Sequence, residues 1–184
     1  SGGRGQFGDV TLRIEPLEAG SGLVFESEIT GATLPTEYFG PVEQGFKEAA
    51  QSGVVAGHPV VDIKAILIDG SHHEVDSSEV AFKIDSSMAF KEACQKASPF
   101  ILEPVMLMEV VTPEEFLGDV LGDLQSRRAQ VQSMEPQTGL QIVKAHVPLA
   151  ETFQYATILR SNTTGRASFT QELDHYAPAP MKDK

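Results

Sequence analysis

Over residues 105–176 the apolar residues alternate between the two-residue spacing of a strand and the three-to-four-residue spacing of a helix. The successive segments are a strand over 105–111, a helix over 112–128, strands over 129–136 and 140–148 joined by a turn at Thr138-Gly139, a helix over 149–160 and a strand over 166–176. The order β-α-β-β-α-β is that of the ferredoxin-like sandwich. We therefore expect an α+β sandwich of this type in the second half of the chain.

The first of these helices has a capping signal in the sequence TPEE. Thr112 is the expected N-cap, Pro113 lies in the first turn, and Glu115 completes a capping box. The apolar residues that follow recur at helical spacing and form one stripe. They are Phe116, Leu117, Val120, Leu121 and Leu124.

The first half has a different order of elements. We expect a strand over 9–17, a strand over 23–29 that returns as the second half of a hairpin, a helix over 38–52 ended by Gly53, a strand over 59–68 and a helix over 77–97. Asp76 or Ser77 is the expected N-cap of the last helix. This β-β-α-β-α order also predicts an α+β sandwich, here a ribosomal-protein-like fold.

The segment SPFILEP, residues 98–104, separates the two halves. Its two prolines, Pro99 and Pro104, are typical of a boundary between elements. We therefore expect two domains, 1–102 and 103–184, each an α/β sandwich with its own core.

The composition limits the function classes. The 184 residues carry a net charge of −12, which argues against a general nucleic-acid binder but leaves room for local basic contacts. No apolar run approaches the roughly 18 residues that a membrane helix needs. The single cysteine, Cys94, cannot form an internal disulfide, which favours a reducing compartment. Because the chain starts at Ser1 and has no signal segment, we expect a cytoplasmic protein of which this is a piece.

The segment HHEVDSSE, residues 72–79, concentrates titratable groups. As a metal site it lacks the HExxH spacing, and no third ligand can be named beside His73 and Asp76, so we assign no metal ligands. General acid–base chemistry by His73 and Glu74 has no nucleophile beside it. A polar loop that caps the following helix is the plainer interpretation, although it leaves the two histidines unexplained.

The segment SGGRGQFG, residues 1–8, is rich in glycine around one arginine. It lacks the Lys-Ser/Thr ending of a phosphate-binding P-loop, so no nucleotide site is assigned. One interpretation is a flexible leader with glycines at positive φ. The other is a loop that lets the backbone approach an RNA phosphate, with Arg4 supplying charge.

Two further basic clusters lie at the ends of predicted helices. Arg127 and Arg128 close the helix that starts near residue 112, and Arg160 and Arg166 flank the end of the next one. Cations at a helix C-terminus are favoured by the helix dipole alone. Two such clusters in an acidic chain also suggest a local surface that faces phosphate.

Several segments together resemble the C-terminal third of bacterial elongation factor G. They are GGRGQFG, HPVVDIK, DGSHHEVDSSEVAFKI, ILEPVM, VVTPEEFLGDVLGDLQSRR, VPLAETFQYATILRS and GRASFTQELDHY. The resemblance runs in order over nearly the whole chain. It implies that the first domain corresponds to the fourth domain of that factor, without its first strand, and the second to the fifth.

The resemblance implies a role in moving tRNA and mRNA through the ribosome. In the family, two loops at the tip of the fourth domain enter the decoding region. One loop would contain Gly2, Gly3, Arg4 and Gly5, and the other His72, His73 and Glu74, with His72 where the family usually has an aromatic residue. The fifth domain would contact large-subunit rRNA and ribosomal proteins through Arg127, Arg128, Arg160 and Arg166.

The resemblance also implies that GTP and Mg²⁺ belong to an N-terminal domain outside this chain, so the segment itself is expected to have no enzymatic activity and no cofactor. Expected partners are the rRNA and proteins of both ribosomal subunits, tRNA, mRNA and the GTPase domains of the same protein, with no membrane. Three alternatives remain open: a paralogous recycling or ribosome-protection factor, a metal-dependent hydrolase that uses the His73 loop, and a ferredoxin-like interaction domain.

Overall fold

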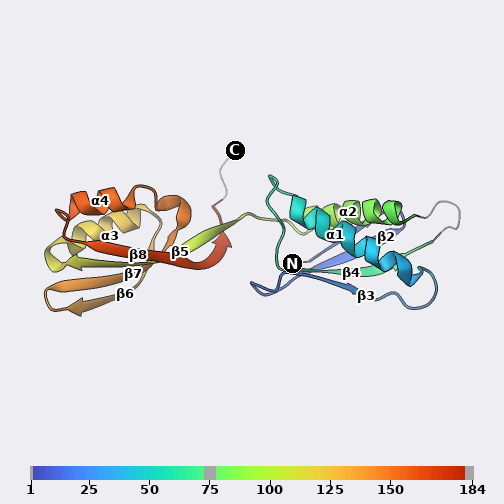
Figure 1. The fold of residues 1–184 in the computed structure, drawn as a ribbon, viewed down its shortest axis with the longest axis horizontal. Coiled ribbons are helices and arrows are strands. Elements are labelled where there is room, and N and C mark those ends of the chain that lie inside the picture. Colours follow the sequence, from blue (N-terminus) through green and yellow to red (C-terminus); the bar gives the residue numbers. More distant parts are fainter. Residues whose placement is uncertain (1, 73–77, 181–184) are drawn as a thin grey trace. The chain divides into compact units, whose positions relative to one another are not determined.

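The chain forms two units, Ser1–Phe100 and Ile101–Lys184, in the computed structural model (Figure 1). The structure describes residues 2–72 and 78–180. Each unit has its own four-stranded sheet and its own cluster of buried apolar residues. The mixed α+β class and the two sheet-containing domains agree with the sequence prediction. The break lies after Phe100, so Ile101 and Leu102 belong to the second unit.

The first unit contains one strand more than the sequence predicted. Its elements are β1 (Gly3–Phe7), β2 (Val10–Pro16), β3 (Leu23–Ser27), the short 3-10 helix η1 (Thr36–Tyr38), α1 (Phe39–Ser52), β4 (Ile63–Gly70) and α2 (Glu79–Lys96). The strand order across the sheet is β1-β2-β4-β3. Helices α1 and α2 cover one face of this sheet (Figure 1). As predicted, α1 ends at Ser52, where Gly53 takes a φ of 79°.

The predicted hairpin between the second and third strands is wrong. Strand β4 lies between β2 and β3, antiparallel to β2 and parallel to β3. The reason lies in the burial of β4 in the folded sheet, where Ala65, Ile66 and Leu67 are all buried. A strand with so little exposed surface is most stable in the centre of a sheet, with a partner on each side. Helix α1 makes the crossover from β3 to the parallel β4.

The glycine-rich N-terminal segment is a strand, so the expected loop at residues 2–5 is wrong. Gly3–Phe7 pairs with β2 in antiparallel register, from Gly3 opposite Ile14 to Phe7 opposite Val10. A Cβ atom on Gly5 would lie 1.9 Å from the carbonyl oxygen of Ala89 in α2. A Cβ atom on Gly3 would lie 2.2 Å from the carbonyl oxygen of Ala93. These two glycines therefore let the helix pack directly on the strand backbone.

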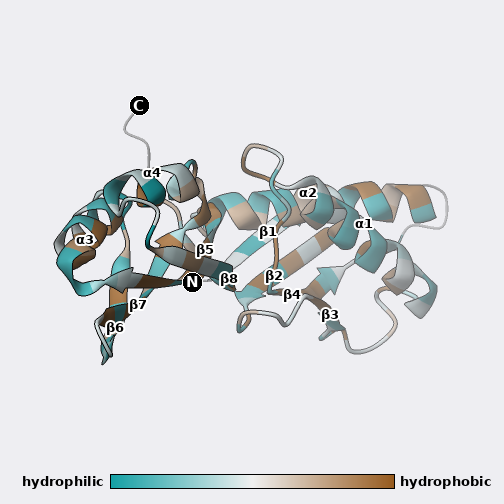
Figure 2. Cartoon of the chain, turned by 60° about the vertical axis from the view of Figure 1, so that its left-hand side comes forward, coloured by the Kyte–Doolittle hydropathy of each residue, from teal (hydrophilic) through white to brown (hydrophobic). Residues whose placement is uncertain are grey.

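The core of the first unit fills the space between the sheet and the two helices. Val10, Leu12 and Ile14 of β2 are almost completely buried. Phe46 of α1 and Phe90 of α2 meet edge to face, with ring centroids 5.1 Å apart. Helix α1 alternates between hydrophobic and hydrophilic residues along its length, as expected for an amphipathic helix (Figure 2).

The second unit has the predicted β-α-β-β-α-β order. Its elements are β5 (Leu102–Pro113), the 3-10 helix η2 (Glu114–Phe116), α3 (Leu117–Ser126), β6 (Gln130–Gln137), β7 (Leu140–Pro148), the 3-10 helix η3 (Leu149–Glu151), α4 (Tyr155–Asn162) and β8 (Ser168–Pro178). The sheet order is β6-β7-β5-β8, and all neighbouring strands are antiparallel. The first and third strands in sequence are central, which is the ferredoxin-like arrangement.

The starts of three helices differ from the predictions. Thr112 is a fully buried residue of β5 and not an N-cap, and no side chain caps η2 or α3. In the predicted helix 149–160, Gln154 takes a φ of 58° and separates η3 from α4. The N-cap of α2 is Ser78, whose hydroxyl accepts a hydrogen bond of 3.1 Å from the N–H of Ala81. The residues predicted for this role, Asp76 and Ser77, lie outside the described residues.

We predict that Gly5→Ala lowers the stability of the first unit by at least about 1–3 kcal/mol, because the new methyl group would overlap the backbone of Ala89. Gly40→Ala is the matched control, since a Cβ atom on Gly40 in α1 meets nothing within 4 Å. It should leave stability unchanged or raise it by about 0.4–1 kcal/mol. Urea unfolding of both variants measures the difference. Equal stabilities would contradict the close packing of β1 on α2.

Candidate nucleic-acid interface

One end of the first unit collects the turn between β1 and β2, the end of β4 and the start of α2. Phe7 pairs with Val10, and Val10 also pairs with Gly70, so the turn at Gly8-Asp9 lies beside the last residue of β4. The N–H of Ser71 donates to the carbonyl of Asp9 over 3.2 Å. We call this end, formed by Phe7–Val10, Gly70–His72 and Ser78–Glu79, the tip end.

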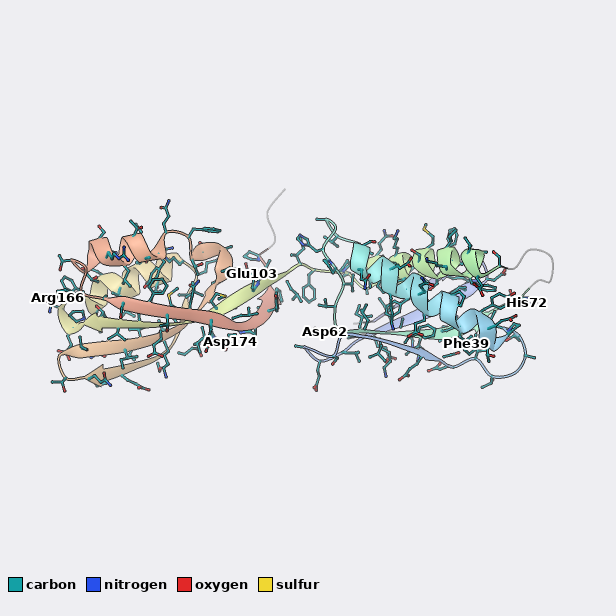
Figure 3. The ribbon with its side chains drawn as sticks, in the orientation of Figure 1. Phe39, Asp62, His72, Glu103, Arg166 and Asp174 are labelled. Carbon is teal, nitrogen blue, oxygen red and sulfur yellow. The ribbon has the colours of Figure 1, made fainter. Side chains whose placement is uncertain are left out.

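His72 packs against aromatic residues at the tip end. Its ring centroid lies 5.2 Å from that of Tyr38, which in turn lies 4.5 Å from Phe82 of α2. Figure 3 shows His72 at the end of β4 that leads to the start of α2. The imidazole therefore continues an aromatic cluster that anchors the residues before the 73–77 segment. His73, Glu74 and Asp76, on which the acid–base and metal interpretations depended, lie outside the described residues.

The turn at Gly8 is held by α2. Gly8 has a φ of 55°, and a Cβ atom there would lie 2.5 Å from a carboxylate oxygen of Asp85. Partial burial raises the pKa of the Asp85 carboxyl, the negative charge of Asp9 raises it further, and a hydrogen bond from the backbone of Asp9 opposes both effects. The tip end therefore holds carboxylates that come close to one another. Sequence reasoning missed Asp85, because its position in the middle of a helix gave no signal.

Residues Gly2–Gly5 do not lie at the tip end. The register places Gly3 opposite Ile14 and Ala93, at the other end of β1, with Arg4 opposite Arg13. The prediction that these glycines and the His72 segment form adjacent loops is therefore wrong. The prediction fails because the strand pairing extends over the whole of Gly3–Phe7 and leaves Gly8-Asp9 as the turn.

Arg4 and its cross-strand neighbour Arg13 differ in their partners. The guanidinium of Arg13 lies 2.7 Å from Glu28 and 3.2 Å from Glu15. Arg4 is exposed and forms no ion pair within residues 2–72 and 78–180. Of these two cations, Arg4 is therefore the one whose charge is available to an external anion.

Arg127 is held inside the second unit. Its guanidinium lies 2.9 Å from Asp123, donates to the carbonyl oxygens of Glu151 and Phe153, and lies 5.0 Å from the ring centre of Tyr155. The side chain is only 12% exposed. These contacts fix the segment between η3 and α4 to the end of α3. The predicted rRNA contact at Arg127 would require this network to open.

Arg128 is also committed to carboxylates, although it is more exposed. It forms a two-pronged contact with Glu103 and lies 3.2 Å from Glu151. Its pKa is raised, with the hydrogen bonds to Glu103 as the largest cause. Arg128 follows the end of α3 with a φ of 56°, a backbone conformation that residues other than glycine rarely take. Both features indicate a structural role at the start of β5 and the end of α3.

The remaining two arginines are exposed. Arg166 forms an ion pair with Glu115, and its guanidinium lies 5.7 Å from the ring centre of Phe116. Arg160 lies in the last turn of α4, and its side chain makes no ion pair with any residue that the structure describes. Phe153, which sequence reasoning did not select, is 74% exposed beside the carbonyl that Arg127 binds. Arg160 and Phe153 therefore both lie exposed in this region.

The two units match two consecutive family models. Residues 1–98 match the family described as elongation factor G, domain IV, and residues 100–184 match the family described as elongation factor G C-terminus. The chain therefore belongs to the elongation factor G family, of which it comprises these two C-terminal domains. No helix among residues 2–72 and 78–180 is long and apolar enough to cross a membrane.

A solved structure supports this assignment. The chain is similar to a crystal structure of a protein from Thermus thermophilus, with 45% sequence identity and a TM-score of 0.81. The alignment covers 98% of this chain and 28% of the Thermus chain. The chain thus spans less than a third of the length of that relative.

We predict that Arg127→Ala lowers the stability of the second unit by about 1.5–3 kcal/mol, because the substitution leaves charge-assisted hydrogen bonds unmade. Arg160→Ala, on the same unit, should change stability by no more than about 0.5 kcal/mol. Thermal or urea unfolding measures both. If the two variants were equally stable, the contacts of Arg127 would not stabilise the fold, and its assignment as a structural residue would be wrong.

We predict that Asp85→Asn raises the unfolding temperature at pH 7. A carboxyl whose pKa is higher in the folded than in the unfolded state destabilises the fold once it is ionised, and this penalty disappears as the pH falls below the ordinary value of 3.8. The difference between variant and wild type should therefore shrink between pH 7 and pH 4. Glu18→Gln, at an exposed residue between β2 and β3, is the control for replacing a surface carboxylate with an amide. A variant less stable than wild type at pH 7 would contradict the prediction.

Proposed function

We propose that this chain is the ribosome-contacting part of a translational GTPase that promotes the movement of tRNA and mRNA. The observation that carries the proposal is the match of the two family models, which follow one another over the whole chain. In this proposal the GTP and Mg²⁺ site belongs to another part of the same protein, which acts in the cytoplasm. Its partners are the rRNA and proteins of both subunits, tRNA and mRNA.

The tip end of the first unit is the surface that we propose to enter the decoding region. Three features support it: the strands and α2 converge there, the turn at Gly8-Asp9 is fixed by Asp85, and Phe7 is 44% exposed. A rigid support with an exposed aromatic ring suits contact with unpaired bases, which proteins bind by stacking. His73 and Glu74, next to the anchored His72, are included in the proposed contact. Arg4, at the far end of β1, would meet RNA elsewhere.

The second unit is proposed to contact large-subunit rRNA through its exposed cations. Arg160 is the strongest candidate, because its side chain forms no ion pair within the described part of the chain. Arg166 can contribute only if an rRNA phosphate displaces Glu115 from its guanidinium or binds the guanidinium together with Glu115. Arg127 and Arg128 would then act indirectly, by holding the end of α3 and the segment around Phe153.

The proposal predicts that tip variants of the full-length protein slow translocation. Phe7→Ala removes a ring at the tip end, and His73→Ala removes the imidazole that follows His72 in the sequence. Each should reduce the single-turnover rate about ten-fold, because a lost base contact costs roughly 1–3 kcal/mol. His58→Ala is the matched control, since His58 is an exposed histidine between α1 and β4, at the opposite end of the unit. Its rate should be unchanged.

Ribosome-stimulated GTP hydrolysis and the melting temperature are measured for the same variants. We expect both to stay close to the wild-type values, because an exposed residue contributes no more than about 0.5 kcal/mol to stability. Wild-type translocation rates in both tip variants would overturn the assignment of the tip end. A loss of rate in His58→Ala as well would show that the effect is not specific to this end.

A further inference from the structure

Two histidines and an aspartate gather on the sheet of the second unit. His146 belongs to β7, and Asp174 and His175 belong to β8. Strand β5 lies between these strands, with Leu107 opposite His146 and Val105 opposite His175. We call these three residues the His-Asp-His cluster. Sequence reasoning missed it because β7 and β8 are separated by a helix in the sequence and by β5 in the sheet, so the spacing of the three residues gave no signal.

The cluster lies on the face of the sheet that does not hold the core. Val143, Ala145 and Val147 of β7 point into the core, so His146, between two of them, points to the opposite face. In Figure 3 Asp174 likewise lies on the side of β8 away from α3 and α4. The three side chains are 25%, 35% and 45% exposed, in sequence order, which leaves them accessible to an ion from solution.

A β-bulge brings Asp174 and His175 to the same side. Val105 pairs with His175, whereas the next residue, Met106, pairs with Leu173, so Asp174 is the additional residue of the bulge. In a regular strand two consecutive side chains would point to opposite faces. Because of the bulge, a carboxylate oxygen of Asp174 lies 2.6 Å from Nδ1 of His175 and 3.4 Å from Nε2 of His146.

We propose that the His-Asp-His cluster binds a divalent transition-metal ion, with Zn²⁺ as the ion that its ligands suit. Two imidazole nitrogens and one carboxylate oxygen form a ligand set found in zinc proteins. One ligand atom from each residue lies within 4.8 Å of the others. Tetrahedral bonds of about 2.0–2.2 Å place ligand atoms roughly 3.3 Å apart, close to the 3.4 Å between His146 and Asp174.

Only a small adjustment separates the observed arrangement from a metal site. The 2.6 Å contact between His175 and Asp174 has to lengthen by roughly 0.7 Å, as the ion takes the place of the shared proton. The imidazole rings of His146 and His175 already meet at an angle of 75°, with centroids 5.2 Å apart. The three residues leave a fourth position open, which a water molecule or an external ligand would fill.

The surroundings of the cluster favour a cation. Glu172 lies opposite Leu107, in the same cross-strand row as His146. Lys144, two residues before His146 on the same face, is paired in register with Glu109. The chain as a whole carries a net charge of −12, which raises the local concentration of cations. A bound ion would connect β7 to β8 across β5 and so stabilise the sheet of the second unit.

The test is a zinc titration of the 184-residue chain in competition with a chromophoric zinc indicator. We expect one ion per chain. His146→Ala, Asp174→Asn and His175→Ala should each weaken binding by at least about ten-fold, since even residues that only support a ligand have effects of this size. His58→Ala is the control for an exposed histidine outside the cluster and should leave the affinity unchanged. Co²⁺ in place of Zn²⁺ should give visible absorption bands that the cluster variants lack.

Further variants separate this site from the other histidines. The double variant His72→Ala/His73→Ala should bind zinc like the wild type. If it lost binding while His146→Ala kept it, the ion would belong to the 72–79 segment and the proposal would be wrong. If the wild type bound zinc no more tightly than a His146→Ala/His175→Ala double variant, the proposal would also be wrong.

Thermal unfolding gives an independent measurement. A ligand that binds only the folded state raises the unfolding temperature, so Zn²⁺ should stabilise the wild type and His58→Ala, and a chelator should reverse the effect. Zn²⁺ should not raise the unfolding temperature of His146→Ala or His175→Ala. Stabilisation of these two variants equal to that of the wild type would place the ion elsewhere and overturn the proposal. None of these outcomes depends on the proposed role in translocation.

Discussion

The direct packing of helix α2 on the backbone of β1 determines how the first unit is arranged. The carbonyl oxygens of Ala89 and Ala93 occupy the space that side chains on Gly5 and Gly3 would need. Helix α2 runs antiparallel to β1 along this contact. Further toward the start of α2, Asp85 lies against Gly8. The start of α2 and the turn after β1 therefore reach the same end of the unit. The tip end exists because Gly3 and Gly5 of β1 carry no side chains and so accept a helix at this distance.

The parts of the fold that depend on local spacing could be predicted from the sequence. The second unit was predicted in its order because strand and helix periods alternate clearly between residues 105 and 176. The strand pairing of the first unit could not be predicted in the same way. Neighbours in sequence favour a hairpin, whereas the burial of Ala65, Ile66 and Leu67 places β4 between β2 and β3. This burial is a property of the assembled sheet and not of any one segment.

The candidate site was predictable only in part, for the same physical reason. Glycines occur both in loops and where two backbones approach closely, and the partners of Gly3 and Gly5 are far away in sequence. The sequence does not distinguish an arginine at a helix end that faces solvent from one that faces the interior. Only the folded chain shows that Arg127 contacts Asp123 and two carbonyl oxygens, while Arg160 remains exposed. With 26 acidic and 14 basic side chains, many cations have a carboxylate within reach.

The charges at the tip end restrict how it can contact RNA. Asp9 and Asp85 come together at the turn, and Glu79 stands in the first turn of α2. A surface with these carboxylates does not neutralise phosphates, which is the usual source of affinity for nucleic acids. In the proposed function, a contact made there would come from rings and uncharged hydrogen-bonding groups, such as the exposed ring of Phe7. Contacts of this kind depend on the position of individual bases, so in the proposed function they would respond to whether a base is in place while adding little unspecific attraction to the surrounding rRNA.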